Sequence, residues 1–88
     1  MRESTVEAAF RKRIKACGGE AYKFVSPGRR GVPDRLVLRP IPNYHRPIVA
    51  NYIWFAEVKA PGKKPRLEQN REHKRLRDMG FVVEVVDR

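Results

Sequence analysis

The chain has a single cysteine, no long apolar run and half as many acidic as basic residues. Cys17 alone cannot form an intramolecular disulfide or a cysteine-based zinc site, so it suits a reducing, intracellular setting. No apolar stretch approaches the roughly 18 residues needed to cross a bilayer, and the polar, charged start does not resemble a signal peptide. We therefore expect a cytoplasmic protein that has no membrane partner.

The deficit of acidic residues leaves a large positive charge. Twenty lysines and arginines against ten acidic residues give a net charge of +10. Such an excess in a short chain favours a polyanionic partner, with nucleic acid the first candidate and an anionic membrane surface the weaker second. No helix-turn-helix, zinc-finger or RNA-recognition signature is present, so we expect binding without sequence specificity.

The length predicts one domain over residues 1–88. Hydrophobic residues make up 41% and charged residues 34% of the chain, which indicates a folded, highly charged protein. A domain of this size buries only about 60–65% of the surface of its unfolded chain, so it is marginally stable alone. A homodimer is a natural way to enlarge its core.

The first helix has clear signals at both ends. Ser4 and Glu7 match a capping box at its start, and Gly18 and Gly19 end it. Apolar residues recur between them at helical spacing and predict one buried stripe: Val6, Ala9, Phe10, Ile14 and Cys17.

Four strands and a second helix follow the first helix. We predict strands over residues 21–25, 35–39, 52–60 and 81–86 and a helix over 67–79. The third strand is apolar on both faces until near its end, which predicts a central, covered strand. The order is therefore αβββαβ, an α/β fold in which helices flank one mixed sheet.

Two further segments have distinct signals. Pro40, Pro42 and Pro47 exclude a central strand between the second and third strands and indicate a long connection or a protruding arm. In the second helix, the spacing turns Leu67 and Met79 inward, together with Gln69, His73 and Leu76.

Carboxylates interrupt the predicted sheet at two strand ends. Asp34 opens the second strand, and Glu57 stands near the end of the third, on the same face as Lys59. If these two strands pair antiparallel, Asp34 and Glu57 meet at one end of the sheet. Such oxygen ligands suit Mg²⁺ or Mn²⁺, and the lysine can orient a water molecule. The ordinary alternative is a turn aspartate and a surface ion pair.

These residues resemble the PD-(D/E)xK nuclease superfamily. Pro33-Asp34 followed by Glu57-Val58-Lys59 matches its motif. The Gly31-Val32-Pro33-Asp34 form, a glutamate at Glu7 and a glutamine at Gln69 resemble more narrowly the VRR-NUC domain family, over nearly the whole chain. The resemblance implies a restriction-endonuclease-like core, DNA as substrate, Mg²⁺ or Mn²⁺ as cofactor, and a phage or bacterial source.

The resemblance also implies a role for each matching residue. Asp34 and Glu57 would bind the metal, with the Val58 backbone carbonyl as a further ligand, and Lys59 would assist catalysis. Glu7 would be a catalytic residue and a further metal ligand, and Gln69 would support the active site. Helix capping and a first-turn polar position are the ordinary alternatives for Glu7 and Gln69.

Basic residues are concentrated on the two loops that flank the motif residues. We expect five of them to contact DNA phosphates: Arg29, Arg30, Lys63, Lys64 and Arg66. Each is also compatible with an ordinary solvated charge.

The resemblance predicts a metal-dependent endonuclease acting on structured DNA. Stand-alone members resemble dimeric Holliday-junction resolvases, and a two-fold dimer matches the near two-fold symmetry of a four-way junction. A nickase or structure-nonspecific duplex nuclease is an alternative within the same enzyme class. A catalytically silent, basic DNA-binding module is the alternative outside it.

Overall fold

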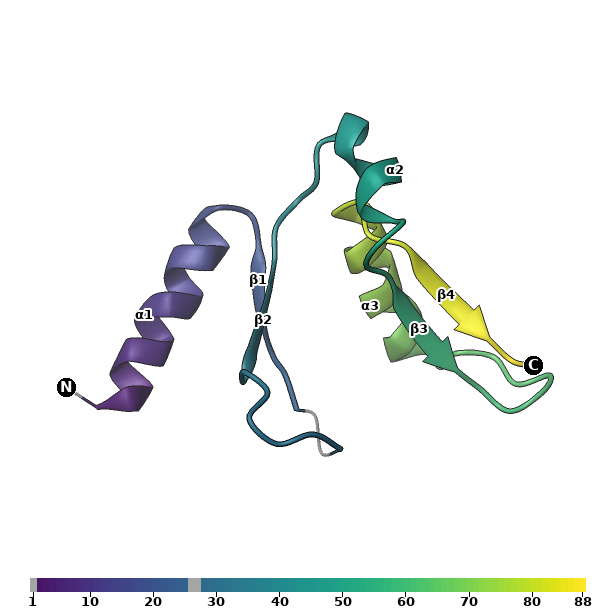
Figure 1. The fold of residues 1–88 in the computed structure, drawn as a ribbon, viewed down its shortest axis with the longest axis horizontal. Helices are drawn as coiled ribbons and strands as arrows, with labels where there is room; N and C mark the ends of the chain where they lie inside the picture. The colour runs from purple at the N-terminus through teal and green to yellow at the C-terminus, as the bar shows by residue number, and fades with distance from the viewer. Residues whose placement is uncertain (1, 26–27) are drawn as a thin grey trace. The chain divides into compact units, whose positions relative to one another are not determined.

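The computed structural model describes residues 2–25 and 28–88. The chain divides into two compact units, Met1–Pro40 and Ile41–Arg88, and each has its own secondary structure (Figure 1). The first two residues of the predicted loop 26–33 lie outside the described residues.

The first unit is a helix packed on a two-stranded sheet. Helix α1 (Glu3–Ala16) is followed by strand β1 (Glu20–Lys23), which pairs antiparallel with β2 (Arg35–Leu38). The buried apolar residues are Ile14, Ala21 and Leu38. At the turn between α1 and β1, a Cβ on Gly19 would lie 2.5 Å from the Leu38 carbonyl oxygen, so only glycine permits this close approach.

The start of α1 differs from the prediction. The helix begins at Glu3, with Arg2 in the N-cap position and no side-chain capping bond, so Ser4 does not cap it. The predicted stripe is also only partly correct. Ile14 is buried and Phe10 half-buried, whereas Val6 and Cys17 are exposed. One turn after Glu3, Glu7 is instead engaged by a residue of β2.

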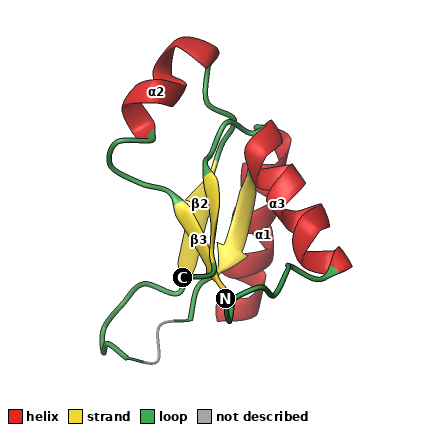
Figure 2. Ribbon diagram, turned by 90° about the vertical axis from the view of Figure 1, so that its right-hand side faces the viewer, coloured by secondary structure: helices red, strands yellow, loops and turns green. Residues whose placement is uncertain are grey.

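The second unit is a β-α-β arrangement preceded by a short helical segment. Strand β3 (Phe55–Val58) pairs in parallel with β4 (Val83–Val86), and helix α3 (Leu67–Asp78) connects them. Parallel pairing requires such a crossover. The buried residues are His73, Leu76, Met79 and Val83. Figure 2 shows the preceding helix α2 (Arg46–Val49) joined to β3 by a stretch of loop.

The proline-rich segment contains helical turns that the sequence pattern did not reveal. A 3-10 turn, η1 (Asn43–His45), runs into α2. The Arg46 side chain donates from Nε to the Ile41 carbonyl oxygen over 2.9 Å. It also fills the space beside Gly80, where a Cβ would lie 2.9 Å from Arg46 Cδ. The segment is therefore tied to the end of α3, although Tyr44 and Ile48 remain exposed.

The predicted single mixed sheet is only partly correct. The α/β class and the order of the four strands are confirmed, but the described strands form two two-stranded sheets, β1-β2 and β3-β4. The expected antiparallel pairing of strands 35–39 and 52–60 is not among these pairs. Among the described strands, β3 pairs with β4 alone, in parallel, because helix α3 returns the chain beside it.

Two predictions of burial are wrong. The strand expected over 52–60 extends only over Phe55–Val58. Val58 is 74% exposed, so the face of β3 that carries Val58 is not covered. Leu67, expected to point inward, is 64% exposed because it stands at the first position of α3. Among the described residues, no helix is long and apolar enough to cross a membrane.

Candidate active site

Glu7 is held by an arginine of β2. Its Oε1 atom accepts hydrogen bonds from Arg35 Nε over 3.0 Å and from Arg35 Nη2 over 2.5 Å. Arg35 Nη1 also donates to the Ala21 carbonyl oxygen over 3.2 Å. The Arg35 hydrogen bond, and secondarily its charge, lower the pKa of Glu7 below the ordinary glutamate value. Glu7 therefore links α1 to the sheet as a carboxylate.

Asp34 lies beside this ion pair. It stands immediately before β2, where its carbonyl oxygen accepts the Phe24 backbone N–H over 2.9 Å. The backbone bond fixes the position of the residue and leaves its carboxylate exposed. Asp34, Glu7 and Arg35 all line one cavity of about 290 Å³. The first unit thus brings two of the predicted acidic site residues together around one cavity, beside Arg35 of β2.

Strand β3 places Glu57 and Lys59 on one face. Phe55, Glu57 and Lys59 are half-buried, whereas Ala56 and Val58 are exposed, as expected when successive side chains point to opposite faces. This alternation agrees with the prediction that Glu57 and Lys59 lie on the same face.

The backbone of β3 also sets the direction of the Val58 carbonyl group. The N–H groups of Phe55 and Lys59 bond to Val82 and Val86 over 3.0 Å and 2.8 Å. Backbone groups alternate between the two edges of a strand. The Val58 carbonyl therefore points to the edge of β3 away from β4, where it is available to a ligand.

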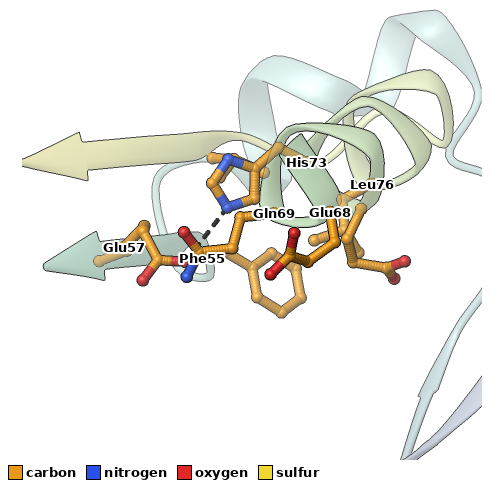
Figure 3. Close-up of a pocket in the computed structure, with 9 residues that line it drawn as sticks. Phe55, Glu57, Glu68, Gln69, His73 and Leu76 are labelled. Atoms are coloured by element: carbon orange, nitrogen blue, oxygen red, sulfur yellow. Dashed lines mark hydrogen bonds and ion pairs between the residues drawn. The ribbon is translucent and has the colours of Figure 1, made fainter. Parts of the chain in front are cut away.

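Gln69 and His73 of α3 lie next to Glu57. The two residues are four apart and therefore share one face of the helix. Gln69 and His73 line a cavity of about 300 Å³ together with Glu57, Phe55 and Leu76 (Figure 3). His73 is buried, and its Nε2 atom is 3.3 Å from Glu57 Oε1.

Gln69 has a second role at the start of α3. Its Oε1 accepts the Arg66 backbone N–H over 2.9 Å, so the helix-capping alternative is correct for this oxygen. Since the Gln69 side chain also lines the Glu57 cavity, the capping bond fixes the amide group there.

The five basic residues expected to contact DNA are all exposed. They belong to the loops before β2 and before α3: Arg29, Arg30, Lys63, Lys64 and Arg66. Arg66 pairs with Glu68 over 3.1 Å, with both side chains 70% exposed, and such a surface pair is weak enough to be exchanged for a phosphate.

Sequence reasoning did not assign a site role to two residues that contact predicted site residues. The sequence pattern predicts Arg35 only as the first residue of a strand, and its long-range pairing with Glu7 has no local sequence signal. His73 was placed on the inward face of its helix, four residues after Gln69. Its position beside Glu57 follows from the β3-α3-β4 crossover, which the pattern did not predict.

Each unit carries oxygen donors of the kind that a hard divalent cation prefers. Within the described parts of the chain, no three His, Cys, Asp or Glu side chains converge. Mg²⁺ needs only one or two carboxylates, with waters and substrate phosphates filling its other positions. Asp34 in the first unit, and Glu57 and the Val58 carbonyl in the second, are each donors of that kind.

An acidic residue and a lysine share one face at the end of β3 in a strongly basic α/β protein. Comparison with known proteins indicates a nuclease. The chain is 49% identical over 87 residues to "Putative nuclease p44" of Acyrthosiphon pisum secondary endosymbiont phage 1, covering 99% of this chain and 84% of that protein. A solved structure of a "VRR_NUC domain" is 38% identical to this chain. The match covers 97% of this chain and 83% of the solved chain, with a TM-score of 0.41. No family model matches.

The chain belongs to the VRR-NUC family. Sequence identities of 49% and 38%, over nearly the full length of this chain and more than four fifths of each relative, carry this conclusion.

Proposed function

We propose that the protein is a Mg²⁺- or Mn²⁺-dependent endonuclease that cuts branched DNA, acting as a homodimer on four-way junctions. The observation that carries the proposal is the common face of Glu57 and Lys59 on β3 in a member of the VRR-NUC family. The net charge of +10 supports a DNA substrate. The homodimer and the junction rest on the family resemblance and on symmetry.

The residues divide into those that hold the metal and those that act on the water. Asp34, Glu57 and the Val58 carbonyl would hold the cation, which when bound supplies Lewis-acid polarisation of the phosphodiester. The Lys59 ammonium group would orient the attacking water and stabilise negative charge on the phosphate oxygens. Glu7 would complete the acidic set through Oε2, because Arg35 already occupies Oε1.

Gln69 and the basic loops have supporting roles in this proposal. With Oε1 of Gln69 held by the Arg66 backbone, its amide N–H₂ group is the end available to a water or a phosphate oxygen. Arg29, Arg30, Lys63, Lys64 and Arg66 would contact backbone phosphates, which positions DNA without sequence readout.

The test is cleavage of labelled four-way junction, duplex and single strand with and without Mg²⁺. Wild type should cut the junction most rapidly and only with metal, whereas Asp34→Ala and Lys59→Ala should not cut. Equal cutting of plain duplex would favour the nickase or duplex-nuclease alternative. Tight binding without any cutting would favour the silent DNA-binding module.

The mass of the protein in solution tests the homodimer. A dimer is expected at the concentrations at which the junction is cut on both strands. A strict monomer that still cuts symmetrically would overturn this part of the proposal.

A further inference from the structure

We propose that His73 is a positioning residue that holds the Glu57 carboxylate through an Nε2–H···Oε1 hydrogen bond and leaves Oε2 for a divalent cation. This inference rests on the proposed function, in which Glu57 is a metal ligand. The contact itself lies wholly within the second unit, between β3 and α3.

The geometry favours orientation of Glu57 by His73 over the reverse. The His73 side chain is 8% exposed and the Glu57 side chain 27% exposed, so the histidine is the fixed partner. His73 Nε2 is 3.3 Å from Glu57 Oε1. Figure 3 shows the ring on the α3 side of the cavity, with the contact directed to the Glu57 carboxylate.

The second ring nitrogen identifies the tautomer. His73 Nδ1 is buried and has no hydrogen-bond partner among the described residues. A proton on Nδ1 would be a buried, unsatisfied donor, whereas a bare lone pair there is less costly. A carboxylate also requires a donor on Nε2. Both considerations place a proton on Nε2, so that His73 donates to Glu57.

A single hydrogen bond on one carboxylate oxygen suits a metal ligand. Arg35 places two charged hydrogen bonds on one oxygen of Glu7 and counters its charge. His73 makes one bond, to Oε1 of Glu57, and in the proposal Oε2 is assigned to the cation. Groups that hydrogen-bond to metal ligands fix the ligand's orientation, and their loss typically costs about 10- to 100-fold in metal affinity.

Mn²⁺ binding to the full-length protein, measured by calorimetry without DNA, tests the proposal. His73→Leu removes the donor and keeps a buried side chain of similar bulk, and it should lower Mn²⁺ affinity by about 10- to 100-fold. His73→Gln places an amide N–H near the Nε2 position and should recover most of the loss. A merely structural histidine would not show this rescue.

Met79→Leu is the matched control. Met79 is also buried at the end of α3 but does not line the Glu57 cavity. The Met79→Leu variant should keep wild-type Mn²⁺ affinity even if its melting temperature changes. Unchanged affinity in His73→Leu would overturn the proposal, and so would an equal loss in His73→Leu, His73→Gln and Met79→Leu.

A second measurement does not need metal. Long-range ¹H–¹⁵N correlation of the metal-free protein, with the His73 signal assigned by its loss in His73→Gln, should show a protonated Nε2 and a bare Nδ1. The opposite tautomer would overturn the proposal alone. Wild type that binds no Mn²⁺ would refute the proposed function and this role of His73 together, whereas normal binding by His73→Leu would refute only the role of His73.

Discussion

The two units of the chain hold a glutamate in opposite ways. In Met1–Pro40, Glu7 is bound by the Arg35 guanidinium group, and in Ile41–Arg88, Glu57 is bound by a single histidine nitrogen. The first arrangement offsets the carboxylate charge and links a helix to a sheet. The second is a single contact from a histidine ring. We therefore expect Glu57 to be better prepared to bind a cation, and Glu7 to stabilise the fold.

The largest expected effect distinguishes these two glutamates in DNA cleavage. Glu57→Gln should lower the rate of Mg²⁺-dependent junction cleavage by about 10³-fold, since a metal ligand contributes several kcal/mol of charge stabilisation. Glu7→Gln should lower it by only about 10-fold, since Arg35 already occupies one oxygen. Single-turnover rates at saturating Mg²⁺ provide the measurement. Equal losses in the two variants would contradict the comparison.

The next effect concerns stability and the predicted single domain. Ile14→Ala in the first unit and Leu76→Ala in the second remove buried side chains, so each should lower the free energy of unfolding by about 2–5 kcal/mol. If residues 1–88 fold as one domain, both variants shift one common transition in urea. Circular dichroism together with Trp54 fluorescence, which reports on the second unit, provides the measurement.

Separate transitions would show that the units unfold independently. In that case Ile14→Ala would leave the Trp54 transition at its wild-type midpoint. Val6→Ala, at an exposed position of α1, is the control and should change the free energy of unfolding much less.

Local patterns predicted the elements but not their pairing. The spacing of Ile14 with Phe10, and of His73 with Leu76, identified both long helices because helical periodicity is encoded locally. Strand alternation placed Glu57 and Lys59 on one face for the same reason. The parallel β3-β4 pair joins Phe55 to Val83, and no short-range signal specifies that register.

In the candidate site, too, the sequence predicts single residues but not their long-range contacts. The residue types and spacing select Asp34, Glu57 and Lys59 as candidates, because a motif is a property of the sequence. Arg35 contacts Glu7 across 28 positions and His73 contacts Glu57 across 16, so these contacts depend on the tertiary fold. A long-range partner of this kind can be found only once the packing of helix on sheet is known.

A smaller effect concerns acid stability. Arg35 lowers the pKa of Glu7 in the folded protein, so unfolding takes up a proton as the pH falls below about 4.5, the ordinary glutamate value. The stabilisation is complete above that pH and is lost as the pH falls through the folded pKa. Glu7→Gln should therefore show a shallower acid decline in unfolding free energy than wild type, measured by urea denaturation from pH 6 to about pH 3.

Arg11, which lies on helix α1 with Glu7, provides the control for this pH dependence. Arg11 makes the smallest contribution to the lowered pKa of Glu7, and Arg35 makes the largest. Arg11→Gln should keep a steep acid decline, while Arg35→Gln should match Glu7→Gln. A wild-type slope in Arg35→Gln would show that the ion pair does not set the acid stability of the first unit.

The smallest effect compares the basic loops of the two units. Arg30 and Lys63 are exposed in the loops before β2 and before α3. If each contacts one phosphate, Arg30→Gln and Lys63→Gln should each reduce the slope of log affinity against log salt by about 0.9 on duplex DNA. Binding is measured by fluorescence anisotropy in Ca²⁺ at several salt concentrations. Lys12→Gln, exposed on α1 and outside both loops, should leave the slope unchanged; an equal reduction there would mean that DNA is attracted by net charge and not by the two loops.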